Sequence, residues 1–295
     1  MADIIDASAP CGSMAGFLKG QGIKTVFRYY SRDTIHNEKR LSGAEAQALA
    51  AAGLRIGVVH EARRGDDVSA FSRDLGSQDS VYASNYAATV VGQAAGSAIY
   101  FAVDFDATPD QIQNVILPYF RGVGDGMSSA GPPAHKVGVY GSDATCKAVL
   151  DANLAEFAWL AQSTGWAGFD QFLQSGKWTM RQHAQTTVGG LQCDPSERAP
   201  DVQDIGDFAL PQLVAEVGAR FRQMMSVIAR DGLRLRAGPG TEFDVLRTLP
   251  LGTSVRALRI AGDWTLVDLE HDGAADGFVL SAFLQPAAMP KEDHR

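Results

Sequence analysis

The sequence predicts an α/β fold, a (β/α)₈ barrel followed by a small all-β barrel, and three observations support this. Short apolar runs alternate with helical patterns up to about residue 225, which is the pattern of a parallel sheet covered by helices. Most connections between these runs are short, as the loops of a (β/α)₈ barrel are. After Gln223 the pattern changes to short alternating runs separated by turn residues.

Eight runs are predicted as strands because β-branched and aromatic residues are enriched in them. A doubly wound open sheet is the rival architecture, but no glycine-rich phosphate loop follows the first run. The expected strands are DIIDAS (3–8), TVFRYY (25–30), RIGVVHE (55–61), AIYFAVDFD (98–106), KVGVYGS (136–142), FAWLAQS (157–163), TMRQHAQ (179–185) and LQCDPS (191–196).

Helices are expected between these strands, since several intervening segments open with Ser, Thr or Asp and several close on glycine. The expected helices cover residues 13–22, 42–53, 80–96, 108–127, 142–154, 169–175 and 207–223. Only residues 63–79 and 128–135 are left as longer loops.

Composition excludes several classes of function. The net charge of −8 argues against nucleic acid or an anionic membrane as a partner. The chain has no apolar run of the ~18 residues that a membrane span needs. The first ten residues, MADIIDASAP, lack the basic region and apolar core of a signal peptide. We therefore expect the chain not to leave the cell by the general secretory route on a signal of its own.

The cysteines give no sign of a disulfide framework or a metal site. Cys11, Cys146 and Cys193 have no paired spacing, and His60-Glu61 lacks the second histidine of a zinc-protease motif. We expect small buried thiols, no metal site and no cofactor.

Acidic, aromatic and amide side chains recur at the expected strand exits, the face of such a barrel on which active sites are built. Acids interleaved with Tyr and Trp predict a sugar-binding cleft, where rings stack on the C–H surfaces of pyranoses. The predicted catalytic residues are Asp104, Asp106, Glu61 and Asp6. The predicted substrate-binding residues are Asp194, Arg28, Tyr30, Tyr140, Trp159 and Gln182.

The two aspartates after the fourth run are the strongest single signal. In a strand, Asp104 and Asp106 would point to the same side, with Cα atoms roughly 6–7 Å apart. Two carboxylates held so close raise one pKa, a property that clusters at functional sites. The alternative is that one of them caps the following helix. For Glu61 the alternative is a buried ion pair with Arg28 or Arg63.

The second module is expected to fold separately. We expect domains at 1–222 and 223–287, followed by a charged tail at 288–295. Its arginines alternate along the runs LRLRA and SVRALRI, so they are expected to face outward, where a ligand could meet them. They are Arg230, Arg234, Arg236, Arg247, Arg256 and Arg259.

Together these segments resemble two known families. The motifs IIDAS, TVFRYYS, IYFAVDFDAT, GVYGS, WLAQSTGW and the ending CDPS are similar to those of a glycoside-hydrolase-like TIM-barrel domain of unknown function, related to the family 25 lysozymes. The segments LRLRAGPGTEFDVL, LPLGT, GDWTLV and DGFVLSAFL resemble a bacterial SH3 domain. In cell-wall enzymes such modules commonly hold the protein on peptidoglycan.

The resemblance implies roles for four acids. Family 25 lysozymes carry an Asp-x-Glu pair at the fourth strand exit, which corresponds to Asp104 and Asp106 here, and the Glu position is the general acid. Asp6 and Asp194 also match lysozyme positions that line the cleaved bond. Since this chain has the shorter Asp106, three explanations stay open: the barrel has shifted to suit it, Glu61 shares the acid role, or the domain binds glycan without cutting it.

The expected function is therefore a peptidoglycan hydrolase, specifically an N-acetylmuramidase that binds the glycan strand and cuts it. The alternatives are a non-catalytic cell-wall-binding protein and a secreted antibacterial effector that attacks another wall bond. We expect action at the wall or in the periplasm after phage lysis or specialised secretion, with a delivery or immunity protein as a candidate further partner.

Overall fold

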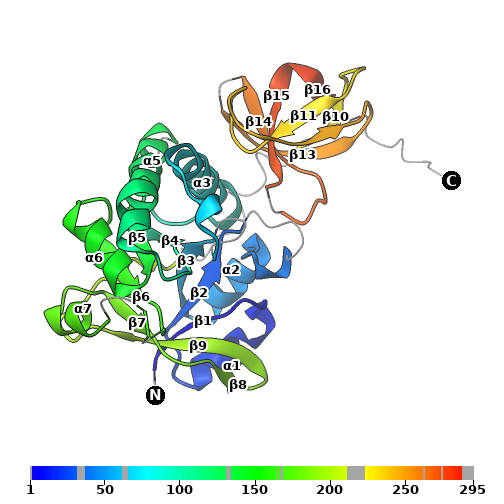
Figure 1. The fold of residues 1–295 in the computed structure, drawn as a ribbon. Coiled ribbons are helices and arrows are strands. Elements are labelled where there is room, and N and C mark those ends of the chain that lie inside the picture. Colours follow the sequence, from blue (N-terminus) through cyan, green and yellow to red (C-terminus); the bar gives the residue numbers. More distant parts are fainter. Residues whose placement is uncertain are drawn as a thin grey trace. The chain divides into compact units, whose positions relative to one another are not determined.

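The computed structural model describes residues 2–31, 37–61, 66–130, 134–163, 165–166, 169–210, 223–261, 263–273 and 275–287. The chain forms two compact units, Met1–Gln212 and Leu213–Arg295, and each is described by itself (Figure 1). The domain boundary predicted at residue 222 falls among residues 211–222, outside the described residues, as does the tail at 288–295. Among the described helices none is both long and apolar enough to cross a bilayer.

The first unit is a closed eight-stranded barrel, which confirms the predicted α/β barrel. Seven strands run parallel in sequence order, and an antiparallel strand, β9, closes the ring between β7 and β1. The barrel strands are β1 (Ile4–Asp6), β2 (Thr25–Tyr29), β3 (Arg55–His60), β4 (Ala98–Ala102), β5 (Lys136–Gly141), β6 (Phe157–Leu160), β7 (Met180–Gln182) and β9 (Leu191–Arg198).

The eighth strand differs from a regular (β/α)₈ barrel, because a hairpin and not a helix leads into it. Strand β8 (Thr186–Val188) pairs with β9 across a turn at Gly189 and Gly190, whose φ angles are +59° and +91°. Two consecutive residues with positive φ make the tight turn that reverses a strand, and glycine adopts them without strain. The chain therefore re-enters the barrel in the opposite direction.

Helices cover the outside of the barrel (Figure 1). Side-chain caps explain where several of them begin: Ser42, Ser72, Thr108 and Ser142 each accept a hydrogen bond from the backbone three residues on. The helices are α1 (Ala15–Gly20), α2 (Gly43–Ala51), α3 (Arg73–Tyr86), α4 (Pro109–Gln111), α5 (Leu117–Ser129), α6 (Asp143–Asp151) and α7 (Phe169–Ser175), with π-helical turns η4 (Ala87–Val91) and η5 (Ile112–Ile116) and 3₁₀ turns η1 (Gly12–Met14), η2 (Asn37–Lys39) and η3 (Val68–Ala70).

One helix starts earlier than the sequence analysis predicted. The segment 63–79 was expected to be loop, but α3 begins at Arg73, directly after its cap Ser72. Most of the helix expected at 207–223 falls among residues 211–222, outside the described residues.

Aromatic rings fill the barrel interior. Phe27 packs against Trp159 and Tyr100, with ring centroids 4.8 and 5.7 Å away, and all three side chains are buried. Gly57 leaves room for this layer, since a Cβ atom there would lie 2.3 Å from the Phe27 ring. The plugged interior supports the side chains at the carboxyl ends of the strands.

The second unit is a separate all-β sheet, as predicted, in the order β12-β11-β15-β14-β13-β10-β16. Its core contains Val227, Leu235, Val255 and Val267. The strands are β10 (Gln223–Val227), β11 (Leu233–Arg236), β12 (Val245–Leu249), β13 (Ser254–Ala261), β14 (Trp264–Asp268), β15 (Gly277–Leu280) and β16 (Leu284–Pro286), and the 3₁₀ turn η6 (Ser281–Phe283) precedes the last of them.

Not all of the arginines in this unit face outward, which corrects the prediction from alternation. Arg236 is buried and donates to the carbonyl oxygens of Thr241 and Phe243. Arg256 donates to the His271 carbonyl oxygen at 2.9 Å and lies 3.5 Å from the buried Asp268 carboxylate. Each guanidinium thus satisfies backbone oxygens of its own sheet, whereas Arg230, Arg234 and Arg247 are exposed.

Candidate active site

Side chains alternate along β2, and this decides which of them reach the barrel mouth, the end of the barrel at the carboxyl ends of its parallel strands. Phe27 belongs to the interior cluster and Tyr29 packs against it, so these two residues point inward. Arg28 and Tyr30 point outward, toward the helices, and both side chains are fully buried. The structure therefore does not bring Arg28 and Tyr30 into the cleft, contrary to the sequence prediction.

The outward residues have structural partners. Arg28 donates from Nε to the Oε1 atom of Glu45 on α2 at 2.9 Å, and from Nη1 to the carbonyl oxygen of Ala7. The Tyr30 hydroxyl donates to Gln93 Oε1 at 2.9 Å. A planar guanidinium suits a buried carboxylate, so this ion pair fastens α2 to the barrel.

Asp6 lies at the carboxyl end of β1, where both of its carboxylate oxygens accept a hydrogen bond. Gln182 Nε2, at the end of β7, donates to Oδ2 at 2.8 Å, and the Tyr29 hydroxyl donates to Oδ1 at 3.1 Å. Burial, opposed by these bonds, raises the pKa of Asp6 to about 7, with the charge of Asp194 contributing. Asp6 thus exchanges its proton near neutral pH.

Asp194 lies opposite Asp6, where the last barrel strand, β9, pairs with the first, β1. The two residues are direct partners in the antiparallel ladder between β1 and β9, so their side chains share one face. Asp194 is half-buried, and burial raises the pKa of its carboxyl group. It reaches the mouth because β9 runs antiparallel, which places the early part of this strand beside the ends of the parallel ones.

Glu61 and Lys39 form a charged pair at the same end. Glu61 follows β3 in the same alternation as the interior Val59, and its Oε2 lies 2.6 Å from Lys39 Nζ. The ammonium also lies 4.8 Å from the centre of the Tyr29 ring, a cation–π distance. Lys39 was not predicted from the sequence, because nothing in its segment marks it as a neighbour of the strand ends.

Asp104 belongs to this group of charges, but not as part of a strand. Strand β4 ends at Ala102 and the chain bends at Phe105, so the expected strand alternation through Asp106 is wrong. The pKa of Asp104 is raised by partial desolvation and by the charge of Glu61. Asp106 lies two residues further along the same loop and is exposed; the helix cap is Thr108.

Tyr140 and Trp159 form adjoining parts of the site. The Tyr140 hydroxyl donates to Gln182 Oε1 at 2.9 Å, and its ring packs edge-on against Trp159 with centroids 5.0 Å apart. Trp159 is almost fully buried and donates from Nε1 to Ser196 Oγ at 3.1 Å. The indole therefore forms part of the floor, which corrects its predicted role as a direct sugar contact.

Of the predicted residues, the structure thus gathers Asp6, Glu61, Asp104, Tyr140, Gln182 and Asp194 at one end of the barrel and adds Tyr29 and Lys39. In the described part of the chain, no group of three His, Cys, Asp or Glu side chains is placed to hold a metal ion. The arrangement offers three carboxyl groups with raised pKa values, those of Asp6, Asp104 and Asp194, together with hydroxyl and amide groups that can bind sugar oxygens and one ammonium group.

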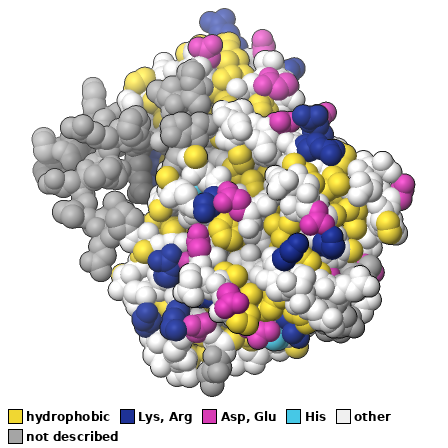
Figure 2. All heavy atoms as spheres, turned by 90° about the vertical axis from the view of Figure 1, so that its left-hand side faces the viewer, with side chains coloured by type: hydrophobic (Ala, Val, Ile, Leu, Met, Phe, Trp, Pro, Cys, Tyr) yellow, Lys and Arg dark blue, Asp and Glu magenta, His cyan; other side chains and the backbone are white. Residues whose placement is uncertain are grey.

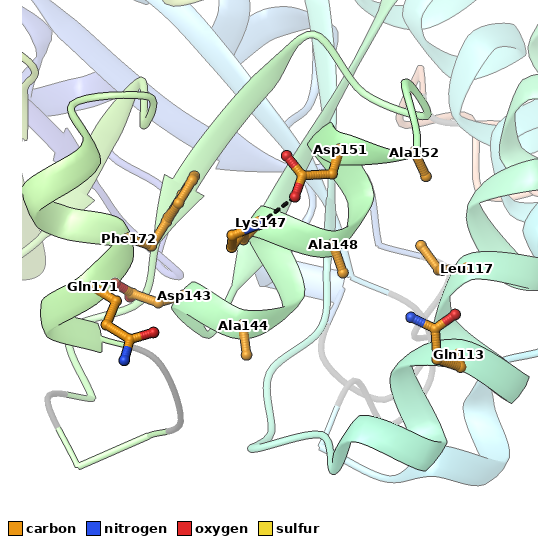
Figure 3. A pocket seen from close by; sticks show the side chains of 10 residues that line it. All are labelled: Gln113, Leu117, Asp143, Ala144, Lys147, Ala148, Asp151, Ala152, Gln171 and Phe172. Atoms are coloured by element: carbon orange, nitrogen blue, oxygen red, sulfur yellow. Dashed lines mark hydrogen bonds and ion pairs between the residues drawn. The ribbon is translucent and has the colours of Figure 1, made fainter.

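A surface pocket lies elsewhere in the first unit. About 510 Å³ in volume, it is lined by residues of the helical layer, among them Gln113, Ala144 and Phe172 (Figure 3). Lys147 and Asp151 form an ion pair on its wall. Acidic and basic side chains are interspersed on the face that Figure 2 shows. No carboxyl group of the barrel mouth lines this pocket, so the pocket is separate from the candidate active site.

Comparison with known proteins decides the family. The family model described as Rv2525c-like, glycoside hydrolase-like domain matches residues 17–205, and that of the bacterial SH3 domain matches residues 231–285. The chain belongs to the Rv2525c-like glycoside hydrolase-like family. This family assignment confirms the resemblance drawn from the sequence motifs, and the bacterial SH3 domain coincides with the second unit.

Two relatives from Bacillus subtilis (strain 168) are uncharacterized. YbfG is 30% identical over 252 residues, covering 79% of this chain and 34% of YbfG. FadG is 28% identical over 176 residues, covering 58% of this chain and 30% of FadG. The chain thus spans about a third of the length of these relatives.

The Mycobacterium tuberculosis Tat-secreted protein Rv2525c has a similar solved structure, reported in complex with L-tartrate and with HEPES. The two chains are 21% identical at a TM-score of 0.55, covering 70% of this chain and 98% of Rv2525c. This likeness shows a shared fold.

Proposed function

We propose that this chain of the Rv2525c-like family is a peptidoglycan hydrolase that cuts the glycan strand as an N-acetylmuramidase. The observation that carries the proposal is the set of carboxyl groups at the barrel mouth, where Asp6, Asp104 and Asp194 all have raised pKa values. Glycoside hydrolysis needs one protonated and one ionised carboxyl group on either side of the bond, and repulsion among clustered carboxyl groups keeps some of them protonated while others ionise.

Asp104 is the proton donor in this proposal. Its side chain is exposed at the mouth, so it can reach a glycosidic oxygen, and desolvation and the charge of Glu61 favour its protonated form. As the bond between C1 and the leaving oxygen breaks, the proton passes to that oxygen and positive charge develops on the ring. The carboxylate of Asp194, on the strand opposite β4 in the ring, stabilises that charge. Water then adds to C1 and gives its proton to the Asp104 carboxylate, which completes the hydrolysis and restores the acid.

The remaining polar groups position the sugar. The hydroxyl of the half-buried Tyr140 and the Lys39 ammonium stand at the mouth beside the carboxyl groups. The lysozyme resemblance assigns proton donation to Asp106 instead, on the exposed loop after β4. Variants at the two positions separate these assignments.

The second unit holds the enzyme on the wall in this proposal, as bacterial SH3 domains of cell-wall enzymes do. Its exposed Arg230, Arg234 and Arg247 are the basic groups that could contact an anionic polymer. The relative Rv2525c is Tat-secreted. We place the action of this chain at the cell wall likewise, outside the cytoplasm.

Digestion of purified peptidoglycan followed by mass spectrometry tests the activity. New reducing ends on muramic acid are expected, with a loss of at least about 100-fold in Asp104→Asn and a smaller loss in Asp106→Asn. New free amino groups with intact glycan would show a peptidase or amidase. A wild-type protein that sediments with walls but releases nothing would show a binding module, the alternative favoured by Asp106 in place of the lysozyme Glu.

A further inference from the structure

A chain of hydrogen bonds links the barrel mouth to a buried carboxyl group. It runs from the Tyr140 hydroxyl to Gln182 Oε1 at 2.9 Å, and from Gln182 Nε2 to Asp6 Oδ2 at 2.8 Å. Gln182 and Asp6 are buried, whereas Tyr140 is half-buried and lies among the charges of the mouth. The amide of Gln182 therefore stands between two groups that can each donate a proton in a hydrogen bond.

This chain has two self-consistent arrangements. When Asp6 is a carboxylate it only accepts, so the amide turns its NH₂ group toward Asp6 and its oxygen accepts from Tyr140. When Asp6 takes a proton from solvent, its hydroxyl can donate to the amide oxygen. The amide then turns over, and its NH₂ group donates to the Tyr140 oxygen. A phenol hydroxyl both donates and accepts, so each arrangement gives a partner to the carboxyl oxygens of Asp6 and to the amide oxygen and nitrogen of Gln182.

We propose that Gln182 is a positioning residue that couples the charge on Asp6 to the direction in which the Tyr140 hydroxyl donates. With Asp6 ionised, that hydroxyl is held by Gln182. With Asp6 protonated, the Tyr140 hydroxyl no longer donates to Gln182. Its O–H bond can then point into the mouth, toward Asp104 or a sugar oxygen. This role rests on the proposed function, because it sets when Tyr140 is available to substrate.

The surroundings of the network place the switch near neutral pH. Asp6 faces Tyr29 on β2, Gln182 on β7, Asp194 on β9 and Lys39 on η2. Burial raises the pKa of Asp6 to about 7, the bonds from Gln182 and Tyr29 and the charge of Lys39 oppose the shift, and Asp194 adds to it.

At the other end, burial raises the pKa of Tyr140, and the charges of Asp104, Asp6, Asp194 and Glu61 add to the shift. Tyr140 thus stays protonated while Asp6 titrates, as the switch requires.

Carbon-13 NMR on the full chain, with labelled aspartate carboxyl and tyrosine ring carbons, tests the coupling without any substrate. In the wild type, the Tyr140 signal should shift with the same midpoint as the Asp6 carboxyl. In Gln182→Met, Asp6 loses a hydrogen bond to its charged form, so its proton affinity should rise about tenfold. The Tyr140 step should fall to less than half of its wild-type amplitude.

Tyr29→Phe is the matched control, because it removes the other hydrogen bond to Asp6 and leaves the path to Tyr140 intact. In this variant the proton affinity of Asp6 should also rise. The Tyr140 signal should still shift with the Asp6 midpoint, at full amplitude. A Tyr140 signal that does not titrate with Asp6 in the wild type would overturn the proposal without any variant, as would a full step in Gln182→Met. A coupled step in a protein that releases no glycan would overturn the proposed function and leave this inference standing.

Discussion

Asp6 and Asp194 lie opposite each other in the ladder that joins the first and last strands of the barrel, with their side chains on the same face. Two carboxyl groups in this relationship cannot both ionise without cost, and one of them is fully buried. The barrel mouth is therefore a place where protonation, stability and chemistry are linked.

The first prediction concerns stability and pH. The pKa of Asp6 is raised from 3.8 to about 7, so the folded state binds more protons than the unfolded state between these values. Stability from this group is complete below pH 3.8 and is lost as pH rises toward 7, by at most about 4 kcal/mol. Asp6→Asn should remove this loss, so its unfolding free energy relative to wild type should increase between pH 4 and pH 8. Urea unfolding at the two pH values measures it, and an unchanged difference would contradict it.

A second prediction concerns Lys39. Its charge lowers the pKa of both Asp6 and Asp104, so Lys39→Met should raise both and move the pH dependence of glycan release upward. Lys24→Met is the control, because Lys24 pairs with Asp3 at the opposite, amino-terminal end of the strands. Rates measured from pH 4 to pH 9 test this, and the idea fails if both variants follow the wild-type profile.

The buried ion pair on the outside of the barrel gives a third prediction. Glu45→Ala leaves the Arg28 guanidinium charged and buried, so it should destabilise the barrel by about 3–5 kcal/mol. Lys147→Ala breaks an exposed pair on α6 and should cost less than about 1 kcal/mol. Thermal or urea unfolding compares the two, and similar losses would mean that burial does not govern the Arg28–Glu45 pair.

Glycines provide a fourth prediction, on packing. Gly57→Ala adds a Cβ atom 2.3 Å from the Phe27 ring, so it should cost about 1–3 kcal/mol through overpacking of the barrel interior. Gly16→Ala in α1 meets nothing within 4 Å and should stabilise the helix by up to about 1 kcal/mol. Urea midpoints of both variants test the packing of this layer, and a neutral Gly57→Ala would refute it.

The fifth prediction concerns wall binding by the second unit. Arg234→Glu combined with Arg247→Glu reverses two exposed charges, so sedimentation with cell walls should weaken several-fold at low salt. The difference should shrink as salt screens the charges. Asp231→Lys with Asp263→Lys, also at exposed positions, changes the charge by the same amount in the opposite direction and should strengthen binding. Equal binding by all three proteins would show that the unit serves another purpose.

The sequence was sufficient to predict the barrel, the second unit and most of the acids at the mouth, because strand periodicity and strand exits are local patterns. It failed where a shift of one residue changes the face. Along β2, Tyr29 points inward and Arg28 outward. The opposite alternation fits the sequence equally well, and only packing in the fold decides which of the two occurs. Lys39 was missed because a loop brings it to the site. Asp194 was predicted, but the hairpin that reverses its strand was not, although Gly189-Gly190 was a readable signal for that turn.

The hairpin that supplies β9 also has a consequence for how the protein is made. Strand β1 leaves the ribosome early, but β9, which pairs with it to close the barrel, is complete only at Arg198. The barrel therefore cannot close until nearly the whole first unit has been synthesised. Two acids of the mouth, Asp6 and Asp194, meet at that last junction. Before then, Asp6 remains accessible to water and ionised, and its proton uptake should coincide with the final closing step of folding.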